Sequence, residues 1–399
     1  MSAVLVLNSG SSSLKFAVFE RAASLRPLAR GSVSRLGHAP RLSLVLEGVA
    51  QPGLPLPDAP MTTAEAARLV FSQLEQHGLL QHVDVVAHRI VHGGQDFISP
   101  TLLDAPTLQR LHALSPMAPM HQPANLEVVA LAAALLPHAA QVGAFDTAFH
   151  AQRPRVDRLY ALPLALADEG IIAYGFHGLS YQHVSKVLRE RTGDAAGGRA
   201  VVAHLGSGAS LCAMRDGASV ATSMGFSALD GLPMGSRCGS LDPGVVLHLI
   251  GERGMSVEAV TTLLYQQSGL LGLSGISSDM QVLLASEDPH ARAAVELFAY
   301  RTGQGIASMA AALGGLDTLV FTAGIGENAA EVRRMICEAC RWMGVRLDPG
   351  LNASTERGPR AIGAGDSAVA VLVLPTDEEL AVAEQVLLHQ GVQAASTAP

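Results

Sequence analysis

The stretch VLVLNSGSSSLKFAVF at residues 4–19 predicts how the chain begins to fold. An aliphatic run meets a polar turn of Asn, Ser and Gly at 8–13, and apolar residues then resume, which is typical of strand, turn and strand. The stretch AVVAHLGSGASLCAM at residues 200–214 has the same order of apolar run, Gly/Ser turn and apolar run. The SGxS cores of the two turns lie 198 positions apart, almost half the chain, and this spacing predicts a duplicated domain.

The chain around these two hairpins alternates between strand-like and helix-like patterns. We expect strands at 83–88, 141–145, 316–321 and 368–374, and helices at 63–77, 124–136, 181–192 and 291–313. Alternation of this kind indicates an α/β fold with largely buried sheets.

Composition excludes several classes of protein. With 399 residues, 49% hydrophobic and 16% charged, the chain is long and apolar enough for two globular domains and does not match a disordered protein. A net charge of −8 argues against a broad nucleic-acid-binding surface. The lysines, Lys15 and Lys186, do not follow a glycine, so no P-loop motif is present.

Location and metal content are also constrained by the sequence. The longest uncharged apolar stretch, 128–136, is half a membrane span, and the N-terminus lacks the pattern of a secretory leader, so we expect a cytoplasmic protein that binds no membrane. Four scattered cysteines fit a reducing compartment. Cys337 and Cys340 form a lone CxxC, for which free thiols are favoured over zinc because no second ligand pair lies nearby.

The segment from Thr222 to Pro243 is the first candidate binding region. It carries glycines at 225, 231, 235 and 239 and no regular hydrophobic period. Loops of about 20 residues without secondary structure are uncommon in compact domains and are often functional. We therefore predict a binding role, with a plain surface loop as the alternative.

The Gly/Ser turns at 8–13 and 206–210 are candidate phosphate sites. Their backbone N–H groups and hydroxyls suit an anion. Each turn taken alone is explained as a polar hairpin turn. Two such hairpins that face each other, however, can bind a polyphosphate from both sides.

Residues 324–329, GIGENA, follow a strand pattern and precede a helical one, as in the dinucleotide fingerprint GxGxxA. An NAD site is one interpretation. The motif lies far from the start of the chain, however, and Glu327 would place negative charge beside a pyrophosphate. A nucleoside-binding loop at a helix N-terminus stays open as the alternative.

Polar residues at the ends of the predicted strands are candidates for chemistry. Arg89 ends an apolar run, where a guanidinium needs either a buried partner or an anionic ligand. Asp146 follows the strand at 141–145, where α/β sheets bind ligands. His177 precedes a helix that Ser180 can cap.

The segment Thr376-Asp377-Glu378-Glu379 precedes the C-terminal amphipathic run. Thr376 and Glu379 fit a capping box, which gives Glu379 a structural explanation. Glu378 has none, and we expect it to bind a metal.

Taken together, these residues resemble the acetate and propionate kinase family of the actin-like and sugar-kinase ATPase superfamily. The resemblance spans residues 5–380 and rests on blocks in the same order as in that family: LVLNSGSSSLKF, AHRIVHGG, FDTAFH, YGFHG, HLGSGAS, TSMGF with DGLPMGSRCGSLDPG, SGLLGLSGISSD, VFTAGIGEN and LPTDEEL.

The resemblance implies two similar lobes, each a mixed β-sheet flanked by helices, with the active site in the cleft between them. The expected first lobe comprises 1–149 plus 376–399, and the expected second, nucleotide-binding lobe comprises 150–375. It also implies ATP as co-substrate, Mg²⁺, a short-chain carboxylate and its acyl phosphate, and a homodimer.

Site residues follow from the same blocks. The catalytic positions are Arg89, Asp146, His177 and Arg237, and the magnesium positions are Asn8 and Glu378. The resemblance implies that the acid is bound by Arg89, Val91, Met120, Phe176 and Ala228. It implies that ATP is bound by Lys15, His204, Leu205, Gly206, Ser207, Gly208, Asp279, Met280, Gln281, Gly324, Ile325, Gly326, Glu327 and Asn328.

Several positions depart from the family pattern. Ser207 and Gln122 stand where the family usually has Asn, and Gln281 stands where it usually has Arg. Leu179 and Tyr181 replace the usual Thr and His, and Ala228 replaces the usual Pro. Ser207 and Gln281 leave the nucleotide base preference open.

The expected reaction is reversible phosphoryl transfer from ATP to acetate, with propionate as a further acceptor. Arg89 would orient the carboxylate, and Arg237 and His177 would bind the oxygens of the transferring phosphoryl group. Asp146 would position magnesium or polarise the acceptor. A propionate kinase and a non-catalytic ATPase of the same superfamily are the alternatives.

Overall fold

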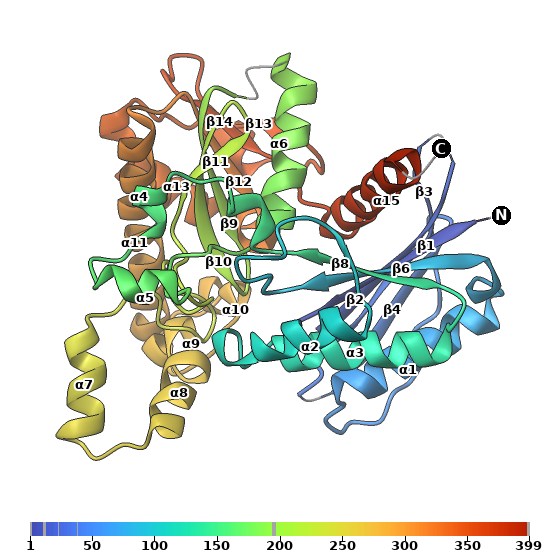
Figure 1. The fold of residues 1–399 in the computed structure, drawn as a ribbon. Coiled ribbons are helices and arrows are strands. Elements are labelled where there is room, and N and C mark those ends of the chain that lie inside the picture. The colour runs from blue at the N-terminus through green and yellow to red at the C-terminus, as the bar shows by residue number, and fades with distance from the viewer. Residues whose placement is uncertain (1, 11–12, 23, 38, 194–196, 397–399) are drawn as a thin grey trace. The chain divides into compact units, whose positions relative to one another are not determined.

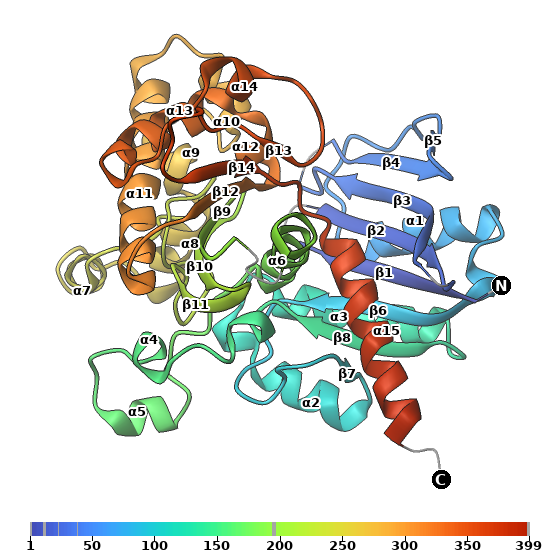
Figure 2. The same ribbon diagram turned by 90° about the horizontal axis from the view of Figure 1, so that it is seen from above.

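The computed structural model describes residues 2–10, 13–22, 24–37, 39–193 and 197–396, so Ser11 and Ser12 of the first turn lie outside the described residues. The chain divides into two compact units (Figures 1 and 2). Unit 1 comprises Met1–Ala148 and Asp377–Pro399, and unit 2 comprises Phe149–Thr376.

Unit 1 is built on an eight-stranded mixed sheet with the order β5-β4-β3-β2-β1-β6-β8-β7. β1 runs antiparallel to β2 and parallel to β6, and β6 is parallel to β8. The strands are β1 (Ala3–Ser9), β2 (Ser13–Glu20), β3 (Arg26–Ser34), β4 (Arg41–Leu46), β5 (Val49–Ala50), β6 (Val83–Ile90), β7 (Thr101–Leu102) and β8 (Ala140–Phe145).

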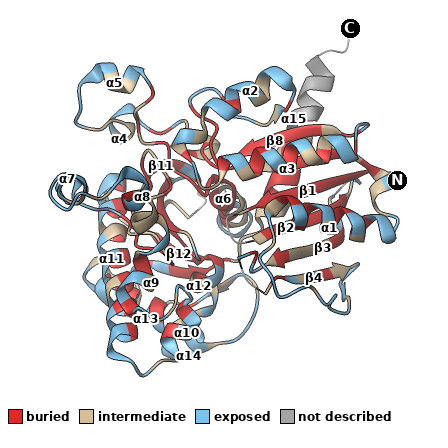
Figure 3. Ribbon diagram, turned by 90° about the horizontal axis from the view of Figure 1, so that it is seen from below, coloured by how far each residue is buried: buried red, intermediate tan, exposed pale blue. Residues whose placement is uncertain are grey.

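Helices cover both faces of this sheet. α1 and α3 pack together on one face, and α15 crosses β1, β2, β6 and β8 on the other (Figure 1). Because both faces are covered, β1 is buried along its whole length (Figure 3). The helices are α1 (Thr63–Gln76), α2 (Ala105–Ala113), α3 (Gln122–Leu135) and α15 (Glu378–Ser396), with 3₁₀ turns at Leu80–His82 and Ser115–Met117.

Unit 2 contains a six-stranded sheet with the order β11-β10-β9-β12-β14-β13. β9 is antiparallel to β10 and parallel to β12, and β12 is parallel to β14. The strands are β9 (Arg199–Leu205), β10 (Ala209–Arg215), β11 (Ala218–Thr222), β12 (Thr318–Thr322), β13 (Arg360–Ala361) and β14 (Ala370–Val373).

The two sheets repeat one topology. The order β3-β2-β1-β6-β8-β7 in unit 1 corresponds strand for strand to β11-β10-β9-β12-β14-β13 in unit 2, with the same parallel and antiparallel pairs throughout. Asn8 and His204 hold equivalent places, each two residues before the first glycine of its hairpin turn. The predicted duplication is therefore confirmed.

Helices α6 and α11 are the main partners of the second sheet. Tyr181, Val184 and Leu188 of α6 pack on β9 and β10, and α11 also contacts β9, β10 and β11. The helices are α4 (Arg155–Arg158), α5 (Leu164–Asp168), α6 (Gly178–Thr192), α7 (Pro243–Gly251), α8 (Val257–Gln266), α9 (Gly269–Ser274), α10 (Met280–Leu284), α11 (Pro289–Leu313), α12 (Ala323–Asn328), α13 (Ala330–Ala339) and α14 (Pro349–Ala353), with 3₁₀ turns at Ala148–His150 and Arg341–Met343.

The structure corrects two local predictions. Residues 324–328 are not an open loop but belong to the short helix α12. α6 begins after His177, which adopts a left-handed conformation, and Ser180 does not cap it because its hydroxyl contacts His204 instead. The segment 223–242 does lack regular secondary structure, as predicted.

Candidate functional site

In unit 1, Arg89 is the centre of a charged cluster at the carboxyl ends of β6 and β8. Its Nε and Nη2 atoms donate to the two carboxylate oxygens of Asp146, at 2.9 and 2.6 Å, and its Nη1 donates to Asn8 Oδ1 at 2.9 Å. Nη1 also lies 3.7 Å from Glu378 Oε2, as an ion pair. Three of the five guanidinium N–H groups make these hydrogen bonds, and the other two can donate to a ligand. The sequence left a buried salt bridge and an anion site as alternatives, and the ion pair with Asp146 is present.

Electrostatics fix the charge of Arg89. Burial by itself would lower the pKa of Arg89, but the carboxylates of Asp146 and Glu378 outweigh burial and raise it. The side chain of Asp146 is 2% exposed. A permanently charged, oriented guanidinium is suited to a carboxylate or a phosphate.

Two acidic side chains of α15 meet the same asparagine of β1. Asn8 Nδ2 donates to Glu378 Oε2 at 3.0 Å and to Glu379 Oε1 at 2.8 Å. The predicted capping box is wrong, because Asp377 caps the helix by accepting from the backbone N–H of Leu380. Glu379 therefore belongs to the same polar cluster as Glu378.

The chemistry of this cluster fits a magnesium ion. Carboxylate oxygens are donors that Mg²⁺ prefers, and Glu378 and Glu379 supply them. Asn8 presents its Nδ2 to these carboxylates and its Oδ1 to Arg89. Burial raises the pKa of Glu379, and the charge of Glu378 adds to this effect, while Lys15 acts against it. A divalent cation would relieve the repulsion between the two carboxylates. Among the described residues, no group of three or more His, Cys, Asp or Glu side chains is arranged to hold a metal.

The other predicted site residues of unit 1 are Val91, Met120 and Lys15. Val91 is buried directly after β6, and its backbone N–H donates to Asn125. Met120 is half-buried in the turn before α3. Lys15 pairs with Asn8 in the β1–β2 ladder and is exposed. Gln122 is fully buried and bonds the backbone of His92, which is a structural role.

In unit 2, His177 lies in an unusual backbone conformation. Its φ of 60° is left-handed, which is uncommon for a residue with a side chain and marks functional or strained sites. Its Nδ1 lies 2.9 Å from Ser210 Oγ, and its ring stacks on His204 with centroids 4.2 Å apart. Ser180 Oγ lies 2.8 Å from His204 Nδ1.

His177 and Arg237 meet at the β9–β10 turn. A Cβ atom built on Gly208 would lie 2.8 Å from Arg237 Nη2 and 3.1 Å from His177 Nε2. Arg237 Nη1 also donates to the carbonyl of Ala228 at 2.5 Å. Glycine at 208 therefore lets two donor groups approach one turn.

The other segments predicted to bind ATP border this turn or α12. Gly235 N donates to Ser207 O, and a Cβ on Gly235 would lie 3.1 Å from Ser278 O, next to the 279–281 segment. Met280 is buried, whereas Asp279 and Gln281 are exposed at the start of α10. In α12, Asn328 Nδ2 donates to Gly324 O, and Glu327 accepts from the backbone N–H of Thr376. Phe176, the predicted acyl contact, is buried.

Arg333 is a residue of this region that the sequence did not reveal. It is 1% exposed, and its Nη1 donates to the carbonyls of Gly326 and Glu327, both at 2.9 Å. Its Nε donates to Asn352 at 2.8 Å. Burial lowers its pKa to about 10. Arg333 thus holds the last turn of α12, and no local pattern identifies such a contact.

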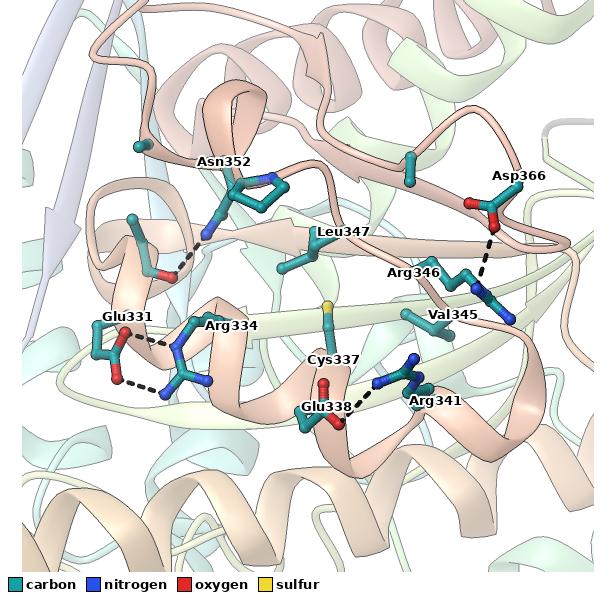
Figure 4. A pocket seen from close by; sticks show the side chains of 14 residues that line it. Glu331, Arg334, Cys337, Glu338, Arg341, Val345, Arg346, Leu347, Asn352 and Asp366 are labelled. Carbon is teal, nitrogen blue, oxygen red and sulfur yellow. Dashed lines mark hydrogen bonds and ion pairs between the residues drawn. The ribbon is translucent and has the colours of Figure 1, made fainter.

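A cavity of 640 Å³ lies beside α13 (Figure 4). It contains none of the predicted site residues. Its three arginines each pair with a carboxylate, as Glu331–Arg334, Glu338–Arg341 and Asp366–Arg346. It therefore offers no unbalanced charge to an ionic ligand.

The sequence is similar to those of known proteins over nearly its whole length. The profile of the Acetokinase family matches residues 3–384. The chain is 48% identical to an acetate kinase of Rhodopseudomonas palustris over 390 residues, covering 96% of this chain and 97% of that one. It is 45% identical to an acetate kinase of Nitrobacter hamburgensis over 395 residues, covering 97% of this chain and 96% of that one.

Solved structures agree with the sequence relatives. A propionate kinase from Francisella tularensis superposes with a TM-score of 0.87 at 35% identity, covering 96% of this chain and 99% of that one. An acetate kinase from Porphyromonas gingivalis superposes with a TM-score of 0.83 at 35% identity, covering 97% and 99%.

The fold is thus that of two-domain α/β kinases with a duplicated sheet. The chain belongs to the acetokinase family. None of the helices in the described ranges has both the length and the apolar character needed to span a bilayer.

Proposed function

We propose that this protein is an acetate kinase that catalyses reversible transfer of the γ-phosphoryl group of ATP to acetate, giving acetyl phosphate and ADP. The observation that carries the proposal is the approach of His177 and Arg237 to Gly208, in a chain that matches acetate kinases over nearly its full length. Propionate is proposed as a further substrate, and the Francisella tularensis neighbour supports this.

The chemistry needs positioning more than a base, because a carboxylate is already ionised near neutral pH. We assign Arg89 to orienting the acid through its two remaining N–H groups. His177 and Arg237 are assigned to the phosphoryl oxygens, where preorganised donors stabilise the charge that spreads in the transition state. Asp146 fixes the orientation of Arg89.

Magnesium is assigned to Asn8 and Glu378, with Glu379 as an additional ligand because its carboxylate meets the same amide as that of Glu378. Asn8 would bind the ion through Oδ1, which accepts from Arg89 in this structure and would have to turn toward the ion. The ion, when bound, neutralises charge on the ATP phosphates. ATP itself is assigned to the β9–β10 turn, the 279–281 segment and α12, so unit 2 is the proposed nucleotide-binding unit. The exposed Gln281 supports a relaxed base preference.

Assembly and location follow as further parts of the proposal. α7 is rich in Val, Leu and Ile, yet none of its residues is buried (Figure 3). Exposed apolar patches of this kind mark interaction sites, and we assign this one to a homodimer. A cytoplasmic location is supported by the free thiols, three of which are buried.

A non-catalytic ATPase of the same fold is the second candidate. It would need no acid-binding group, and the oriented Arg89 speaks against it. A coupled assay that measures ADP formation with ATP and magnesium, across acetate, propionate and butyrate, separates these candidates. Acid-dependent ADP release together with a hydroxylamine-trapped acyl phosphate supports the kinase, and ADP release that is independent of the acid contradicts it.

A further inference from the structure

A buried tyrosine is linked to His177 through one serine. The hydroxyl of Tyr181 lies 2.5 Å from Ser210 Oγ, and Ser210 Oγ lies 2.9 Å from His177 Nδ1. Tyr181 and Ser210 are both 0% exposed. Within the described ranges, the Tyr181 hydroxyl contacts no other hydrogen-bonding group, and the Ser210 hydroxyl contacts only these two.

The number of available protons determines which group donates in each of these two hydrogen bonds. The Tyr181 proton has one acceptor, Ser210 Oγ, so the serine proton must point to His177 Nδ1. In the opposite direction, Nδ1–H would donate to serine and serine to tyrosine. The tyrosine proton would then be buried without an acceptor, which is costly. Nδ1 is therefore an acceptor, and the ring proton lies on Nε2.

The groups around His177 favour the same state. The His204 ring of β9 is stacked on it, and the Arg237 guanidinium approaches the same glycine as its Nε2. A positive charge on His177 would be unfavourable beside the Arg237 guanidinium. The centroid of the His150 ring lies 5.5 Å from that of the Tyr181 ring. His150 is neutral because burial lowers its pKa to about 3.

Tyr181 itself remains a proton donor. Burial raises its pKa well above the ordinary value, and the neighbouring Cys212 adds to this effect. The hydroxyl therefore stays protonated over the range in which an enzyme works.

We propose that Tyr181, acting through Ser210, is a positioning residue that fixes His177 as a neutral imidazole with its proton on Nε2. Nε2, the atom that approaches Gly208, is then the hydrogen-bond donor presented to the phosphoryl group. The inference rests on the proposed function, because that function makes His177 a phosphoryl contact. It adds two residues, at positions 181 and 210, to the catalytic apparatus.

The tautomer is tested directly by ¹⁵N NMR of the histidine-labelled protein near pH 7, with His177→Gln used to assign the signals. We expect a protonated Nε2 and an unprotonated, hydrogen-bonded Nδ1. In Ser210→Ala, the two nitrogens should move toward a mixture of tautomers. An Nδ1–H tautomer or an imidazolium in the native protein overturns the proposal.

Kinetics test whether Tyr181 acts through Ser210. We expect Tyr181→Phe to lower kcat about tenfold and Ser210→Ala to lower it at least as much, with KM for acetate nearly unchanged. Adding Tyr181→Phe to Ser210→Ala should cause little further loss, because residues that act as one unit are not additive. An additive loss, or a normal kcat in Tyr181→Phe, contradicts the positioning role.

Tyr174→Phe is the matched control. It also removes a buried tyrosine hydroxyl in unit 2, one that donates to the carbonyl of Gly170 at 2.9 Å. Its kcat should remain normal although some stability is lost, and an equal drop in kcat would show that the Tyr181 effect is not specific. If the native enzyme phosphorylates no carboxylate, the proposed function fails, whereas the NMR result still decides the tautomer.

Discussion

Glu379 accepts a hydrogen bond of 2.8 Å from Asn8, although 371 positions separate the two residues in the chain. The contact forms because α15 returns to β1 of unit 1. Glu378 accepts from the same amide, so two neighbouring carboxylates share one asparagine. Shared acidic groups of this kind are stabilised by a cation.

The first prediction is that both Glu378→Gln and Glu379→Gln raise the magnesium concentration needed for half-maximal activity, by about tenfold or more. Each change removes a negative charge from the proposed site. Glu65→Gln, in the first turn of α1, is the control and should leave the magnesium response unchanged. An unchanged response in Glu379→Gln would limit that residue to a structural contact.

Local patterns predicted the central strands of both sheets but not the acidic cluster. The repeated hairpin and the alternating runs predicted β1, β2, β6 and β8 of the first sheet and β9, β10, β12 and β14 of the second, but not β3, β4, β5, β7, β11 and β13. The segment 376–379, in contrast, presents three successive acidic residues, and any of them fits a helix start. Asp377 provides the cap and Glu379 turns to Asn8, a choice made by tertiary contacts alone.

The hydrogen bonds around His177 also depend on tertiary contacts. His177 was identified from the family pattern, whereas Tyr181 was noticed only as a departure from it. Its link to Ser210 depends on α6 packing against β10, which no short pattern encodes.

The second prediction compares two arginines. Arg89→Ala and Arg237→Ala should each reduce kcat/KM by at least about 100-fold, because charge-assisted donors in a sheltered site are lost. Arg89→Ala also removes both hydrogen bonds that Arg89 donates to the buried carboxylate of Asp146, and it should cost about 3–5 kcal/mol of unfolding free energy. Urea unfolding of the native protein and of Arg89→Ala checks this loss. An unchanged unfolding free energy would show that the Arg89–Asp146 pair is not a main structural contact.

The third prediction concerns assembly. Leu247 of α7 is 71% exposed, and Leu247→Asp should convert the proposed dimer to a monomer in sedimentation experiments, because it places a charge in the apolar patch. Leu388 of α15 is 70% exposed and provides the control Leu388→Asp, which should remain dimeric. A monomeric native protein, or a dimer that tolerates Leu247→Asp, would exclude the α7 interface.

The fourth prediction is a pH dependence of stability. Burial lowers the pKa of His88 to about 4, and its Nε2 lies 2.8 Å from Gln141 Oε1. Below about pH 6.5 the unfolded chain binds a proton that the folded chain refuses until about pH 4. The free energy of unfolding should therefore fall by up to about 3 kcal/mol as the pH falls through this window.

Urea unfolding at pH 7 and pH 5 measures this effect. His88→Gln removes the titrating group and should reduce the dependence on pH, while buried His150 continues to contribute in the same direction. Identical pH dependence in the native protein and in His88→Gln would show that His88 is not responsible.

The last prediction concerns the length of the acyl chain. Ala228 stands where the family usually has proline, so the proposed acyl-binding wall lacks ring carbons at this position. Ala228 is 8% exposed, and its carbonyl anchors Arg237, a contact that proline can preserve because it keeps the carbonyl.

One methylene in an apolar pocket is worth about 1–3 kcal/mol, so a modest enlargement shifts acid preference by tenfold or more without changing the chemistry. Acetate and propionate should both be good substrates of the native enzyme, and butyrate a poor one. Ala228→Pro should lower kcat/KM for propionate more than for acetate, whereas Ala228→Gly should not. The measurement is kcat/KM for the three acids at fixed ATP and magnesium. Two results would rule out the roomier pocket. One is a kcat/KM for propionate below about a hundredth of the value for acetate, and the other is a propionate-to-acetate ratio that does not change in Ala228→Pro. Either result means that residue 228 does not set the space beside the acyl group.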